Sequence, residues 1–188
     1  GALVDYHARA AIAATGDVIL SRSITGNSIG AKLTIPQGTL FTDSSGNSWL
    51  SARDVIWYSN VTTCKVPIIQ HERYTASALN NMVIPTGDRV ILNLGTLPNG
   101  KYYEQGSMSL QIGGETWVLV DTFAKSKPTD KHFMVSVDEA LNPYIMFGDG
   151  TFGKKPAAGA KITNVVFYLT NGTQGNVKSN TITSVPSV

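Results

Sequence analysis

The chain has 188 residues, of which 42% are hydrophobic and 15% charged, and its formal net charge is +2. A chain of this length buries enough apolar surface to fold without a disulfide or a structural metal. Its scattered lysines and arginines argue against nucleic-acid binding, because such binding requires a clustered basic surface. No stretch is long and apolar enough for a membrane-spanning helix, so we expect no membrane insertion.

The N-terminal segment, residues 1–17, is expected to be helical. Within it, helical spacing relates Leu3, Tyr6 or His7, Ala10 or Ala11, and Ala14, and Gly16 follows them as a stop signal. The segment has neither the basic region nor the apolar region of a signal peptide. Since the chain begins with glycine rather than methionine, we expect it to be an excised fragment of a longer protein.

The next part of the chain predicts strands broken by turns. The β-rich segments are KLTIPQGTLF, DSSGNSW, DVIWYS and CKVPII. Cys64 is in phase with Val66 and Ile68, so we expect a buried cysteine, and a single cysteine excludes an intrachain disulfide. The following segment RYTASALNNMV, within residues 68–84, lacks glycine and proline and predicts a short helix.

From residue 107 onward the apolar residues alternate as they do in strands. Met108, Leu110 and Ile112 share one face, and the glycines of GGE separate this segment from TWVLVD, which predicts a hairpin. FMVSVD, YIMF and KITNVVFYLT continue the β pattern. The expected fold class is therefore mainly β, with antiparallel barrel or sandwich modules, a short N-terminal helix and few other helices.

The stretch FGDGTFGKKPAAGAKI, residues 147–162, contains the pattern G-x-G-x-x-G. A dinucleotide-binding loop must open a helix, which Pro156 and Gly159 forbid here. A kinase glycine loop joins two strands, but too few residues follow for a catalytic loop. A calcium-binding loop needs several acidic ligands, and Asp149 is alone.

The remaining interpretation of this stretch is a tight connection between two strands. Asp149 is expected to bond to nearby backbone and Gly150 to adopt a positive φ, which together form a turn. Phe147 and Phe152 are expected to pack beneath this turn. The stretch therefore predicts a shaped loop without a phosphate ligand.

Two other patterns suggest different chemistry. GNSIG, residues 26–30, matches the nucleophile elbow of serine hydrolases, with Ser28 as nucleophile and His71 or His132 as base. The β-like sequence after it argues against a hydrolase, because an elbow must lead into a helix. The histidines have no metal-ligand spacing.

Three tryptophans, Trp49, Trp57 and Trp117, could form a platform on which sugars stack. Large aromatic residues in β proteins more often fill the core, and we expect that arrangement here.

Three segments, taken in order, resemble the J-like baseplate wedge proteins of contractile phage tails and related injection machines. YIMFGDGTFGKKPAAGAKITNVVFYLTNG resembles the family signature through Phe147, Gly148, Asp149, Gly150, Gly153, Pro156 and Gly159. LTIPQGTLFTDSSGNSWLS resembles its I-P-x-G-T segment and the turn after it, through Ile35, Pro36, Gly38, Thr39, Asp43 and Gly46. GTQGNVKSNTIT resembles its G-x-x-G-N-V segment through Gly172, Gly175, Asn176 and Val177.

The resemblance covers roughly residues 14–185 and implies a domain organisation. Residues 18–75 and 169–188 would form a β-barrel module, which the G-x-x-G-N-V segment closes. Residues 76–168 would form an inserted β-rich module that carries the FGDG hairpin. The long helical N-terminal part and the C-terminal part of a complete family member are missing, which agrees with an excised fragment.

The resemblance also implies a structural role without enzymatic activity. The expected partners are further copies of the chain, as a homo-oligomer, and other baseplate wedge proteins around the tail tube. The expected location is the virion, after synthesis in the cytoplasm of the bacterial host. No catalytic residue, cofactor, metal, nucleic acid, membrane or small-molecule substrate is expected. The alternative is a tail-associated β module that binds host glycans or receptors.

Overall fold

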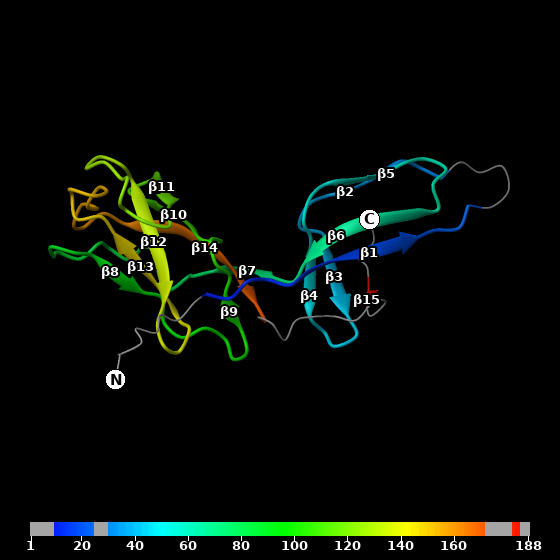
Figure 1. Cartoon of the computed structure of the whole chain (residues 1–188), viewed down its shortest axis with the longest axis horizontal. Coiled ribbons are helices and arrows are strands. Elements are labelled where there is room, and N and C mark those ends of the chain that lie inside the picture. The colour runs from blue at the N-terminus through cyan, green and yellow to red at the C-terminus, as the bar shows by residue number, and fades with distance from the viewer. Residues whose placement is uncertain (1–9, 25–29, 172–181, 185–188) are drawn as a thin grey trace, which may run out of the picture. The chain divides into compact units, whose positions relative to one another are not determined.

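The computed structural model describes residues 10–24, 30–171 and, for the backbone alone, 182–184. All regular elements within these residues are β-strands, which Figure 1 shows in chain order from blue to red. The chain is therefore mainly β, as its composition and alternation predict. No helix within this described part is long and apolar enough to cross a membrane.

The chain divides into two compact units. Unit 1 consists of residues 1–12 and 73–169, and unit 2 consists of residues 13–72 and 170–188. The segment expected to stand apart as an N-terminal helix is thus shared between the two units, and β1 begins within it at Thr15.

Unit 2 contains a five-stranded antiparallel sheet in the order β1-β6-β4-β3-β15 and a two-stranded sheet of β2 and β5. The bounds are β1 (Thr15–Ser21), β2 (Leu33–Ile35), β3 (Leu40–Asp43), β4 (Ser48–Ser51), β5 (Val55–Trp57), β6 (Thr63–Ile69) and β15 (Ile182–Ser184). Its core contains Phe41, Trp49 and Val66, and Cys64 is buried in the same cluster as predicted.

Unit 1 contains an eight-stranded sheet in the order β7-β14-β10-β11-β12-β13-β8, with β9 paired to β14. The bounds are β7 (Glu72–Thr75), β8 (Ile91–Asn93), β9 (Tyr102–Tyr103), β10 (Ser109–Ile112), β11 (Glu115–Leu119), β12 (His132–Val137), β13 (Pro143–Phe147) and β14 (Ile162–Thr170).

The predicted hairpin of unit 1 is confirmed. β10 and β11 pair antiparallel, and Ile112 lies opposite Glu115. Gly113 and Gly114, which join the strands, both have positive φ, at 59° and 79°. This is the conformation that a two-residue hairpin turn requires and that glycine adopts without steric cost.

One strand pair departs from the expected antiparallel arrangement. β11 and β12 are parallel, with Val118 opposite His132 and Leu119 opposite Phe133. Residues 120–131 form the crossover that returns the chain to the same end of the sheet. Parallel neighbours need a crossover of this kind. Because the crossover has no strand pattern of its own, the sequence did not predict the parallel pairing.

The alternation of unit 1 places its core on one face of the strands. Phe133, Ile145 and Phe147 are buried, and Trp117 meets Phe147 edge-to-face with 5.5 Å between the ring centroids. Such aromatic pairs add to the stabilisation that burial already gives.

The predicted N-terminal helix is not present in residues 10–14, and the rest of it lies outside the described residues. Ala11 forms a bridge to Glu104, and the Ala11 carbonyl accepts from the Gln105 amide at 3.0 Å. The Ala14 carbonyl accepts from the Gln70 amide at 2.8 Å. These carbonyls accept from amides far along the chain rather than from the amide four residues later, as a helix requires.

The short helix expected within residues 68–84 was also wrong. This segment begins as β7 and continues as turns, in which the Leu79 amide donates to the Ala76 carbonyl. The Ala76 amide donates to Val165 on β14, so pairing with the sheet holds the backbone extended. Asn81 has a φ of 72°, which ends any helical continuation.

Candidate functional site

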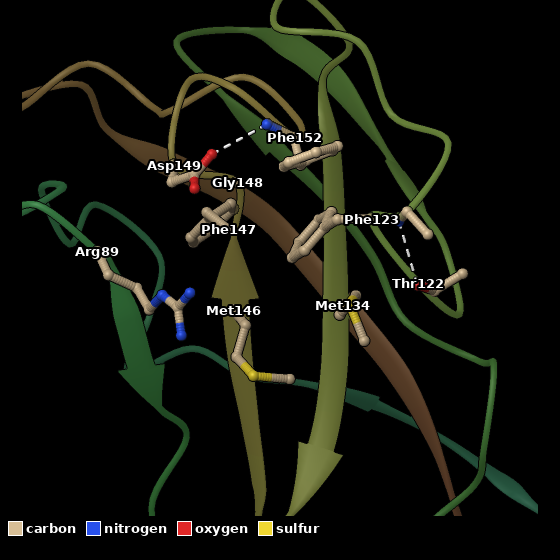
Figure 2. A pocket seen from close by; sticks show the side chains of 10 residues that line it. Arg89, Thr122, Phe123, Met134, Met146, Phe147, Gly148, Asp149 and Phe152 are labelled. Carbon is tan, nitrogen blue, oxygen red and sulfur yellow. Dashed lines mark hydrogen bonds between the residues drawn. The ribbon is translucent and has the colours of Figure 1, made fainter.

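An open hollow of about 610 Å³ lies on unit 1 beside the FGDG turn (Figure 2). It is lined by Arg89, Thr122, Phe123, Ala124, Met134, Met146, Phe147, Gly148, Asp149 and Phe152. Phe147, Gly148, Asp149 and Phe152 belong to the signature stretch. The others come from β12, β13, the crossover and, for Arg89, the segment before β8.

The floor of the hollow is formed by two methionines on neighbouring strands. Met134 on β12 lies directly opposite Met146 on β13, and both are half-buried. Because side chains alternate between the faces of a strand, these methionines lie on the face away from the buried Phe133 and Ile145. Methionine side chains are flexible and polarisable, and they adapt to differently shaped apolar groups.

The walls of the hollow differ in character. Figure 2 shows Arg89 on one side, Phe123 and Thr122 on the other, and Met146 between them. Arg89 is exposed and Phe123 is half-buried. The hollow is therefore an apolar surface with a guanidinium at its margin.

The FGDG turn is held by one carboxylate. Asp149 Oδ1 accepts hydrogen bonds from the amides of Thr151 at 2.8 Å and Phe152 at 2.9 Å. The Gly150 amide donates to the Gly153 carbonyl at 3.0 Å, and Gly150 has a φ of 93°. The tight turn expected of Asp149 and Gly150 is thereby confirmed.

Asp149 is anionic over a wider pH range than a free aspartate. The amides of Phe152 and Thr151 hold the pKa of its carboxyl below the usual value, and Arg89 lowers it further by charge. The margin of the hollow therefore carries one carboxylate and one guanidinium at neutral pH.

Two glycines make a close backbone contact that closes this turn. A Cβ on Gly148 would lie 2.3 Å from the Gly153 carbonyl oxygen. A Cβ on Gly153 would lie 3.3 Å from the Phe123 ring, and Gly153 has a φ of 85°. Both glycines are buried, so the signature glycines fix the loop against the crossover.

Phe147 and Phe152 were both expected to pack beneath the turn, and this prediction is right for Phe147 only. Phe147 is 2% exposed and lies in the core, whereas Phe152 is 54% exposed. Phe152 follows the turn and its amide is tied to Asp149, which leaves its ring at the mouth of the hollow (Figure 2).

The rest of the signature leads directly into β14. Pro156 is buried and lines a second hollow of about 400 Å³ with Pro85 and Lys155. Gly159 has a φ of 81°, and its amide donates to the Ile84 carbonyl. No helix follows the glycine loop in residues 154–170, which confirms that it lacks the context of a dinucleotide-binding loop.

The I-P-x-G-T segment belongs to unit 2. The Pro36 carbonyl accepts from Thr39 Oγ1 and from Ser51 Oγ, both at 2.6 Å. Gly38 has a φ of 82°, and its amide donates to the Ser51 carbonyl. Pro36 and Gly38 thus shape the turn between β2 and β3. Gly175 and Asn176 lie outside the described residues.

Asp43, in the same segment, is a buried carboxylate with four donors. Its Oδ1 accepts from the amides of Ser45 and Asn47, and its Oδ2 accepts from Asn47 Nδ2 and Trp49 Nε1. Burial alone would raise the pKa of the carboxyl, but these hydrogen bonds outweigh it and lower the pKa. The arrangement is that of a structural turn.

The structure gives little support to a serine hydrolase, a sugar-binding platform or a metal site. Ser28 lies outside the described residues, and His132 Nδ1 lies 2.8 Å from the hydroxyl of the buried Ser126. Trp49, Trp57 and Trp117 are all buried, which confirms the core assignment and removes a tryptophan platform for sugars. Within the described residues no group of three histidine, cysteine or acidic side chains could hold a metal ion.

The sequence predicts the turn at Asp149 and Gly150, but it does not predict the hollow beside it. Arg89, Phe123 and Met134 come from separate segments of the chain, and only Met146 lies in the stretch that carries the signature. The sequence signals were the β patterns of FMVSVD and YIMF, which contain the two methionines.

Comparison with known protein families, curated proteins and solved structures finds no match for this chain.

Proposed function

We propose that the chain is a structural subunit of a contractile phage-tail baseplate wedge, or of a related contractile injection machine. In this role it joins other subunits through protein–protein contacts around the tail tube. The proposal rests on the ordered resemblance of three segments to the wedge family. The observation that carries it on the molecule is the apolar hollow bordered by the signature turn.

The geometry of the signature supports a structural rather than a catalytic role. The backbones of its buried glycines, Gly148 and Gly153, contact each other. One carboxylate oxygen of Asp149 accepts hydrogen bonds from two amides of the same loop. A catalytic acid or base needs a reactive group aimed at a substrate. These residues instead give the loop one fixed shape, which is the property a docking surface requires.

The hollow suits a protein side chain better than a small polar substrate. Its floor is Met134 and Met146, and Phe152 stands exposed at its mouth. Interface cores are enriched in aromatic residues, methionine and arginine, and their rims are polar. An apolar side chain of a neighbouring subunit would fill the hollow, while Arg89 and Asp149 pair with polar groups around it.

The assignment of the two units to modules of the wedge family is part of the same proposal. Unit 2 would be the β-barrel module of the family, and the part of unit 1 after residue 73 would be the module inserted into it. The inserted module would present the FGDG hairpin to neighbouring subunits.

The first experiment is size-exclusion chromatography with light scattering, with the chain alone and mixed with the other wedge proteins of its tail. The proposal expects a stable complex with at least one of them. Phe152→Asp places a charge at the mouth of the hollow and should weaken that complex by at least tenfold in Kd.

The matched control is Tyr58→Asp, an aromatic residue of comparable exposure in unit 2. It should leave the affinity within about twofold. A chain that binds no tail protein overturns the proposal, and so does an affinity that Phe152→Asp leaves unchanged. Quenching of intrinsic fluorescence by host polysaccharide would instead favour the receptor-binding alternative.

A further inference from the structure

The sulfur-bearing side chains of the chain, one cysteine and four methionines, differ in their access to solvent. Cys64 and Met108 are buried, and burial raises the pKa of the Cys64 thiol. A buried, protonated thiol reacts slowly with oxidants. Met82, between β7 and β8, is exposed. Met134 and Met146 are half-buried and line the open hollow beside the FGDG turn (Figure 2). The hollow therefore gives solvent access to two thioethers at one place.

The two thioethers lie side by side because of the strand register. Met134 on β12 lies directly opposite Met146 on β13, and Ile91 on β8 lies opposite Met146 on its other side. Directly opposed side chains in an antiparallel pair have Cβ atoms about 4.5–5.5 Å apart. Ile91 is itself exposed. The apolar floor of the hollow thus continues across β13 onto β8.

Oxidation changes the chemical character of this floor. When hydrogen peroxide oxidises a methionine, the sulfur loses two electrons and gains one oxygen, the O–O bond breaks, and the other oxygen leaves as water with both protons. The sulfoxide that results is polar and accepts hydrogen bonds. In the open hollow, water supplies those hydrogen bonds. An apolar group that covers the floor displaces this water and leaves the sulfoxide oxygen without a partner, which is unfavourable.

We propose that Met134 and Met146 form an oxidation switch, in which a peroxide converts them to sulfoxides and the hollow then no longer holds an apolar group. A methionine sulfoxide reductase reverses the switch, because two thiols become a disulfide and the sulfoxide oxygen leaves as water. The inference rests on the proposed function for the identity of the apolar group, which is a side chain of a neighbouring subunit. The chemistry at the two sulfur atoms belongs to the hollow itself.

Peptide mapping by mass spectrometry measures which methionines react. The folded chain is treated with hydrogen peroxide, and the gain of one oxygen at each methionine is followed over time. Met134 and Met146 should react at least tenfold faster than Met108, which is buried. In urea the three methionines should react at similar rates. Equal rates in the folded chain overturn the inference.

An apolar probe tests whether oxidation closes the hollow. Anilinonaphthalene sulfonate becomes fluorescent on exposed apolar surface, and its sulfonate complements the charge of Arg89 at the margin of the hollow. Peroxide, removed before the probe is added, should weaken probe binding at least tenfold. Phe152→Asp, at the mouth of the hollow, should weaken it as well. A native chain that binds no probe overturns the inference.

The decisive variant combines Met134→Leu with Met146→Leu, which keeps the floor apolar and removes both sulfur atoms. After the same peroxide treatment this variant should hold its probe affinity within about twofold. Met82→Leu is the matched control, because Met82 is exposed but does not line the hollow. It should respond to peroxide as the native chain does. The inference is overturned if the double variant loses the probe, or if the fully oxidised native chain keeps it.

Treating the chain before it is mixed with wedge proteins separates this inference from the proposed function. An untreated chain that binds no tail protein overturns the structural role, while the probe still tests the switch. A complex whose Kd is unchanged after both methionines are oxidised overturns the switch and leaves the structural role standing. A Kd that rises at least tenfold on oxidation, and recovers with a sulfoxide reductase and dithiothreitol, supports both.

Discussion

Gly148 and Gly153 approach so closely that a Cβ on Gly148 would lie 2.3 Å from the Gly153 carbonyl oxygen. The neighbouring atoms are backbone and cannot move aside as a flexible side chain would. The contact joins the end of β13 to the loop that precedes β14. The contact explains why glycine is required at position 148, and this explanation needs no ligand.

Gly148→Ala should therefore destabilise unit 1 by about 1–3 kcal/mol or more, as overpacking does elsewhere. Urea unfolding monitored by the fluorescence of Trp117 measures this loss, in a background where Trp49 and Trp57 are replaced by phenylalanine. Gly16→Ala in unit 2 is the control, followed through Trp49 and Trp57 with Trp117 replaced by phenylalanine, because no atom lies within 4 Å of its added Cβ and its φ is not positive. If Gly148→Ala lost no more unfolding free energy than Gly16→Ala, the close contact would be contradicted.

Phe147 and Phe152 should respond oppositely to truncation, although both belong to the same motif. Phe147 is in the core against Trp117, so Phe147→Ala should cost about 3–5 kcal/mol of unfolding free energy. Phe152 is exposed, so Phe152→Ala should stay within about 0.5 kcal/mol. Thermal unfolding of the two variants side by side measures the difference. A large loss in Phe152→Ala would contradict its position at the mouth of the hollow.

Asp43 should make unit 2 sensitive to acid. Its folded-state pKa is lowered, so its stabilisation is fully present above the unfolded value of about 3.9 and is lost as pH falls through the folded value. Asp43→Asn removes the charge and should cost on the order of 1–3 kcal/mol at pH 7. The difference from the native chain should shrink below about pH 4, as urea unfolding at both pH values would reveal. A difference that is constant with pH would contradict this role.

Gln70 should hold the returning chain of unit 2 in place. It is buried, and its Oε1 accepts from Thr170 Oγ1 at 3.1 Å and from the Asn171 amide at 3.0 Å. Gln70→Met keeps the volume but removes this acceptor, and should cost about 1–3 kcal/mol. Hydrogen exchange at the Asn171 amide should quicken.

The control for Gln70 is the same substitution at an exposed hydrogen bond. Gln111 Oε1 accepts from Asn164 Nδ2 at 2.7 Å on the surface of unit 1. Water can replace that bond, so Gln111→Met should stay within about 0.5 kcal/mol. If both variants lost stability equally, burial would not be the cause.

The sequence by itself determined the turns and the faces of the strands. Gly113 with Gly114, and Asp149 with Gly150, act through local backbone geometry, which their neighbours in the chain are enough to specify. The alternation around Met108, Leu110 and Ile112 likewise predicts which side is buried, because the period of a strand is two residues. These predictions needed no knowledge of distant contacts.

Only the tertiary structure decided the order of the strands, the parallel pair of β11 and β12, and the hollow. Ala11 and Ala14 have helical spacing, yet their carbonyls accept from the distant amides of Gln105 and Gln70, because tertiary pairing outweighs the weak propensity of a short helix. Arg89, Phe123 and Met134 meet through strand order and a crossover, and neither leaves a local pattern in the chain. The sheet edges are a property of the same order, since a strand is open only when no other segment pairs with it.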